Sequence, residues 1–161
     1  MKTKGFVAIV TVLTLVGAHA AAAQTATQTV TFQVSAINQV SVAGAPSLLI
    51  NTAAAGSAPT SATSAGNTWS VTTNQTTAKI TASIPSSMPA GLTLSANLTA
   101  PGGATSGGLL ALGTVAVDMV TGITKLNAAG LGLTYQLDAT AAAGVVASST
   151  RVVTYTLTGG T

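Results

Sequence analysis

The sequence predicts an all-β protein: an antiparallel β-sandwich of about eight strands with Greek-key connections, preceded by a cleaved signal peptide. Three observations lead to this prediction. Short segments in which polar and apolar residues alternate recur along the chain. Turn-forming residues, chiefly Gly, Pro and Asn, separate these segments at roughly the 8–12-residue spacing of sandwiches. No segment beyond the N-terminal apolar run has the apolar period of a helix, about 3.6 residues.

The N-terminal residues have the features of a secretory signal peptide. Two lysines precede a short apolar run at residues 6–16, and small residues follow as far as Ala23. The apolar run is shorter than the roughly 20 residues of a membrane-spanning helix. We therefore expect residues 1–23 to be removed, and residues 24–161 to form a single secreted domain with no membrane span.

The first expected strand is Thr29–Ala36. Val30, Phe32, Val34 and Ala36 share one face, and polar residues occupy the other. This period of two is typical of a strand with one buried face.

Seven further segments are expected to form strands after a bulge or bend at residues 36–37 that lets the first strand continue to Val42. The clearest is Leu92–Leu98, which alternates along its whole length. In the segment 78–84, the side chains of Ile80, Ala82 and Ile84 face the same way. The seven segments are 47–51, 68–73, 78–84, 92–98, 109–117, 131–139 and 150–158.

The connections between these strands are rich in small residues. Residues 52–67, 101–108 and 140–149 have no apolar period and are expected to be exposed loops. Residues 118–130 contain one isolated apolar pair and are expected to end in a turn at Asn127–Gly130.

The composition leaves few residues that can carry chemistry. Only 4% of the residues are charged, against roughly 25% in an ordinary soluble protein. Beyond the signal peptide there is no His, Cys or Glu, which excludes Ser-His-Asp and Cys-His arrangements and the usual zinc ligands. Asp118 and Asp138 lie in different segments with no motif joining them. We therefore expect no enzyme activity, no cofactor and no metal.

The cationic residues of the predicted mature chain also form no patch. Lys79, Lys125 and Arg151 are scattered and face two carboxylates, so the sequence does not predict nucleic-acid binding.

The aromatic residues are expected in the core. Tyr135 and Tyr155 lie on the apolar parity of their strands, and so does Trp69. The alternative for Trp69 is an exposed ring that stacks on a sugar.

The predicted signal peptide, the strands rich in Thr, Ala, Gly and Val, and the early alternating segment resemble those of secreted bacterial β-sandwich subunits of surface fibres, such as pilins and fimbrial proteins. The resemblance covers the whole chain through these general features. It implies that an N-terminal strand of one subunit completes the sheet of the next. Residues 24–36 would be that strand. The chain differs from chaperone–usher pilins because it has no Cys and hence no disulfide.

On this basis we expect a structural subunit of an extracellular filament or surface layer, whose partners are copies of itself. The candidate interface residues are Val30, Phe32, Val34 and Ala36. Two alternatives stay open. One is a self-contained secreted or coat domain. The other is a carbohydrate-binding or adhesion module that recognises a surface glycan through Trp69 and a loop.

Overall fold

The structure of this protein is a computed structural model that describes residues 23–160. The chain divides into two units, Met1–Gln33 and Val34–Thr161. In the first unit the described residues, 23–33, form neither helix nor strand. The predicted signal peptide lies outside the described residues except for Ala23, and it stays a prediction.

The described part of the second unit contains nine strands and one short 3-10 helix. The strands are β1 (Asn38–Ala43), β2 (Ala62–Thr73), β3 (Ala78–Ser83), β4 (Leu92–Leu98), β5 (Thr105–Ser106), β6 (Leu110–Ala111), β7 (Val117–Ile123), β8 (Leu126–Ala139) and β9 (Thr154–Thr158), and the helix is η1 (Ala141–Ala143). Every pair of neighbouring strands is antiparallel. The predicted all-β class is therefore confirmed.

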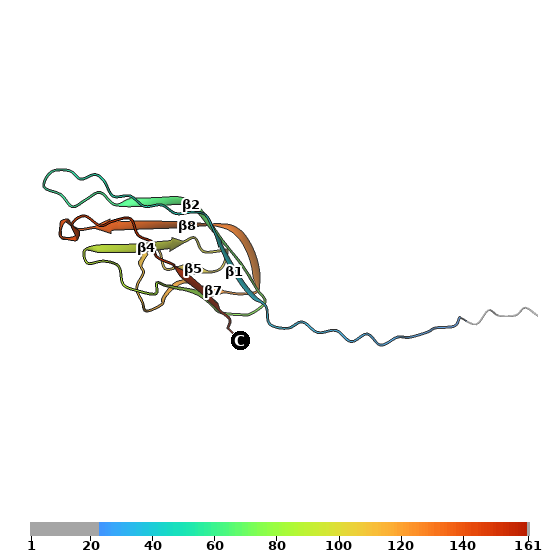
Figure 1. Cartoon of the computed structure of the whole chain (residues 1–161). Coiled ribbons are helices and arrows are strands. Elements are labelled where there is room, and N and C mark those ends of the chain that lie inside the picture. The colour runs from blue at the N-terminus through green and yellow to red at the C-terminus, as the bar shows by residue number, and fades with distance from the viewer. Residues whose placement is uncertain (1–22, 161) are drawn as a thin grey trace, which may run out of the picture. The chain divides into compact units, whose positions relative to one another are not determined.

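The strands form two sheets. One has the order β1-β2-β8-β4-β6 and the other the order β5-β7-β3-β9. The long strands β2, β8 and β4 lie side by side at the centre of the larger sheet (Figure 1). The edge strands of the two sheets are thus β1 and β6 in one, and β5 and β9 in the other.

A single apolar core joins the two sheets. Alternation places the apolar residues of β2, β4 and β8 on one face of the larger sheet, and those of β3 and β7 on one face of the smaller sheet. The buried residues of both sheets belong to one cluster: Trp69, Val71, Ala78, Ile80, Ala82, Ile84, Leu94, Ala96, Leu98, Leu112, Met119, Val120, Ile123, Leu133 and Tyr135. Burial of this surface is the main source of stability in a chain without disulfides.

Several predicted strands are confirmed. β4 has the predicted bounds, β3 ends one residue before the predicted end, and residues 68–73 form the second half of β2. The side chains of Ile80, Ala82 and Ile84 are all buried, as their shared parity predicts.

Other predictions are wrong in the described chain. No strand forms at residues 29–36 or 47–51, and the predicted strand 109–117 is reduced to the two residues of β6. The predicted loop 52–67 ends at Ser61, because β2 begins six residues before Thr68 and pairs there with the end of β8. The last strand begins at Thr154 rather than at residue 150, because its partner β3 ends at Ser83, which pairs with Thr154.

The region 118–130 differs most from its prediction. It forms β7 and the start of β8, and the chain reverses at Thr124 and Lys125 instead of Asn127–Gly130. Lys125 adopts a φ of 43°, a conformation that Gly or Asn usually supplies in tight turns. Sequence patterns favour glycine for such a turn, whereas residues 124 and 125 are Thr and Lys, so the sequence does not indicate this hairpin.

One glycine in β2 and one in β8 form bulges in the ladder between these strands. Gly130 has a φ of 66° at the point where the register with β2 shifts, and its N–H donates to the hydroxyl of Ser70 at 3.3 Å. Gly66, with a φ of 82°, lies at the second register shift. Each bulge adds a residue to one strand and increases its local twist.

Candidate subunit interface

The predicted interface residues lie before β1, and their side chains are exposed. The exposed fractions are 73% for Val30, 89% for Phe32 and 77% for Val34, and Ala36 is exposed as well. The polar residues between them are also exposed. The alternation predicts two faces of different polarity, but this segment forms no strand in the single chain, and its apolar and polar side chains alike are exposed.

The end of this segment is attached to the domain by Asn74, in the turn between β2 and β3. The side-chain amide of Asn74 donates to the carbonyl of Ser35 at 2.7 Å, and its side-chain carbonyl accepts the N–H of Ile37 at 2.8 Å. The backbone N–H of Asn74 also donates to the carbonyl of Ile37 at 3.2 Å. Three hydrogen bonds to one residue therefore fix where the chain enters β1.

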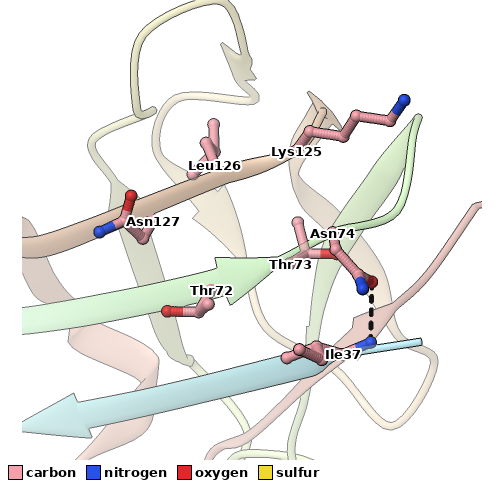
Figure 2. Close-up of a pocket in the computed structure, with 7 residues that line it drawn as sticks. All are labelled: Ile37, Thr72, Thr73, Asn74, Lys125, Leu126 and Asn127. Atoms are coloured by element: carbon pink, nitrogen blue, oxygen red, sulfur yellow. Dashed lines mark hydrogen bonds between the residues drawn. The ribbon is translucent and has the colours of Figure 1, made fainter. Parts of the chain in front are cut away.

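A shallow hollow of about 500 Å³ lies beside this attachment point. Figure 2 shows the side chains around it and the hydrogen bond from Ile37 to Asn74. The lining residues are Ile37, Thr72, Thr73, Asn74, Lys125, Leu126 and Asn127. Lys125 is the only charged residue among them, so the hollow holds no pair of acid and base for catalysis.

A second, smaller hollow lies between the edge strands β1 and β9. Its volume is about 110 Å³, and it is lined by Val40, Ser41, Val42, Val153 and Tyr155. Val42 is 48% exposed and Ser41 is exposed as well, whereas Val40, Val153 and Tyr155 are half-buried. Apolar side chains thus reach the surface where the core is open between the two sheets.

The opposite edges of the sheets are closed. β5 and β6 are joined by only three residues, and this short connection runs from one sheet to the other. The hydroxyl of Ser106 in β5 donates to the carbonyl of Leu98 in β4 at 2.7 Å. The N–H of Gly107 donates to the carbonyl of Met119 at 2.8 Å. The connection therefore covers this side of the core.

The two carboxylates are not brought together. Asp118 lies in β7 and forms an ion pair with Lys79 at 2.9 Å, with both side chains nearly half exposed. Asp138 lies in β8, in the other sheet, and accepts hydrogen bonds from Gln136 and Ser61. No group of three or more metal-ligating side chains occurs among residues 23–160.

Trp69 is a core residue, as predicted. Its side chain is 1% exposed, and the indole N–H donates to the carbonyl of Thr99 at 3.2 Å. A ring buried in this way cannot stack on a sugar at the surface.

Comparisons with protein-family models, with curated proteins and with solved structures found no match to this chain. Within the described residues no helix is long and apolar enough to cross a membrane.

Proposed function

We propose that this protein is a non-enzymatic structural subunit of an extracellular filament or surface layer. In this proposal subunits assemble by strand complementation: residues 24–36 of one copy add a strand to a sheet of the next. The proposed architecture is a β-sandwich with Greek-key connections, since the two sheets share one core and β8 returns to pair with β2.

One observation carries the proposal. Val30, Phe32 and Val34 alternate with polar residues, as in a half-buried strand, and yet they are 73–89% exposed in the single chain. Full burial of one such side chain is worth about 1.5–3 kcal/mol. A row of three therefore gives a strong driving force for a partner, and an extended segment with one apolar face suits the edge of a sheet.

A self-contained secreted or coat domain is the second candidate, and one observation favours it. The buried core begins at Trp69, so residues 24–36 contribute nothing to it. The domain can then be stable without a donated strand. A carbohydrate-binding module is not favoured, because Trp69 is buried.

The test compares assembly with folding. The mature chain, residues 24–161, is examined by size-exclusion chromatography and negative-stain electron microscopy over a range of concentrations. We expect filaments or large oligomers. Phe32→Asp should block them while leaving thermal unfolding of the monomer unchanged. The matched control, Gln33→Asp, should assemble, because its side chain lies on the polar face.

A deletion distinguishes the two candidates. The chain lacking residues 24–36 should fold and fail to polymerise, and it should bind a peptide of that sequence added in trans. If the intact chain stays monomeric at high concentration and the truncated chain does not bind the peptide, the protein is a self-contained domain.

A further inference from the structure

We propose that the acceptor for the donated strand is the free edge of β9, with the hollow between β9 and β1 receiving the apolar side chains. The occupant is the segment around Phe32 of a second copy of this chain. This inference rests on the proposed function and specifies its acceptor.

β9 is an edge strand of the smaller sheet. β9 pairs with β3 on one side only, and within residues 23–160 no strand is hydrogen-bonded to its other side, although β1 lies close by across the hollow. Unpaired strand edges present free N–H and C=O groups that readily accept a further strand. At the opposite end of the smaller sheet, the short connection between β5 and β6 covers the core instead.

The apolar residues of β9 and of the donor segment have the same spacing. Val153, Tyr155 and Leu157 are half-buried, whereas the threonines between them are exposed. The donor segment has the same period, with its apolar residues at even positions. Directly opposite residues in an antiparallel pair lie on the same face of the sheet. One register pairs three apolar residues of the donor with three of the acceptor: Val30 with Leu157, Phe32 with Tyr155, and Val34 with Val153.

This pairing cannot form within one chain. Asn38, the first residue of β1, contacts Gly159 just beyond the end of β9, and Asn74 holds Ser35 nearby. In the antiparallel register Val34 would lie beside Val153, the residue that immediately precedes β9. The four steps from Val34 to Asn38 span about 14 Å at most. The distance along β9 from Val153 to Gly159 is roughly 20 Å. The donor must therefore come from another copy.

The experiment uses disulfide cross-linking, for which the absence of Cys makes the chain well suited. In the proposed register Thr31 lies opposite Thr156, and both side chains are on the exposed face. Mature Thr31→Cys, carrying an affinity tag, is mixed with untagged Thr156→Cys under mild oxidation. We expect a mixed dimer in several-fold higher yield than in the control mixture of Thr31→Cys with Thr105→Cys. Thr105 is an exposed threonine in β5, at the opposite edge of the same sheet.

Further variants separate this inference from the proposed function. Adding Phe32→Asp to the tagged chain should abolish the cross-link to position 156, and adding Gln33→Asp should preserve it. If the protein assembles but position 31 cross-links equally to 105 and 156, or preferentially to 105, the acceptor is wrong and the proposed function stands. If the chain stays monomeric and neither mixture cross-links, both are overturned.

Discussion

The hydroxyl of Tyr155 donates a hydrogen bond of 3.0 Å to the hydroxyl of Tyr135, and this bond joins β9 of one sheet to β8 of the other. Tyr135 is 8% exposed, and Tyr155 is half-buried beside the hollow between β1 and β9. The pair holds the edge strand β9 against the larger sheet. It therefore contributes both to the stability of the domain and to the shape of the proposed acceptor.

Removing one hydroxyl of this pair should destabilise the monomer. Tyr155→Phe leaves the buried hydroxyl of Tyr135 without this partner, which we expect to cost about 1 kcal/mol of unfolding free energy. The double variant Tyr135→Phe/Tyr155→Phe should lose less than the sum of the two single variants, because no unpaired hydroxyl remains. Urea denaturation of the three variants measures the coupling. Purely additive losses would show that the two hydroxyls do not interact.

The same pair predicts a loss of stability at alkaline pH. Burial, together with the hydrogen bond and the charge interaction with Tyr135, raises the pKa of Tyr155 above its ordinary value of about 10. The folded protein thus retains this proton to higher pH than the unfolded chain does. Its contribution to stability is complete below about pH 10 and is lost as the pH rises above that value. The melting temperature should fall above about pH 10, and Tyr155→Phe should show a smaller fall. An identical fall in both proteins would contradict the assignment.

Trp69 should report burial directly, because it is the only Trp in the chain. Its fluorescence should be shifted to the blue and protected from acrylamide in the folded protein, since the ring is 1% exposed. Trp69→Ala should cost about 3–5 kcal/mol of unfolding free energy, and Trp69→Phe should cost less because it keeps most of the ring volume. Emission at the wavelength of a solvated indole in the folded state would contradict this packing.

The sequence predicts a strand well where the alternation lies within that strand, and poorly where the strand forms only by pairing with a distant segment. The strand Leu92–Leu98 was predicted with correct bounds because its alternation is uninterrupted. The start of β2 at Ala62 could not be predicted, because its small residues form a strand only through pairing with β8, which is distant in sequence. Gly130 suggested a turn, and in the fold it makes a bulge inside β8.

The candidate interface shows the same limit. The alternation of Val30, Phe32 and Val34 can be read directly from the sequence, whereas residues 29–36 form no strand in the single chain. In the proposed function they become a strand only on a second copy. The acceptor cannot be read in this way. Whether β9 is an edge strand depends on the order of the strands, which is set by contacts between distant segments.

Processing gives a prediction that is independent of the fold. Two lysines, an apolar run and small residues as far as Ala23 predict export and a mature N-terminus at Gln24 or within about three residues of it. Mass spectrometry of the exported protein gives the answer. Secreted material that retains Met1 would show that the segment is not a cleaved signal peptide.

Asn74 should control the junction between the donor segment and the domain. Asn74→Ala removes the side-chain hydrogen bonds to Ser35 and Ile37, and also the one that Asn74 accepts from the side chain of Gln75, and we expect it to cost about 1 kcal/mol of unfolding free energy. The larger effect should be local: the amide of Ile37 should exchange with deuterium much faster, while amides of the central strand β8 stay protected.

Asn74→Asp is the matched control for this prediction. A carboxylate still accepts the N–H of Ile37 and cannot donate to the carbonyl of Ser35. Exchange at Ile37 should therefore stay close to that of the unaltered protein, whereas Asn74→Ala increases it. If both variants accelerate exchange at Ile37 equally, the side-chain carbonyl of Asn74 does not hold this amide. In that case the entry into β1 is fixed by the pairing of β1 with β2 and by the backbone hydrogen bond from Asn74 to Ile37.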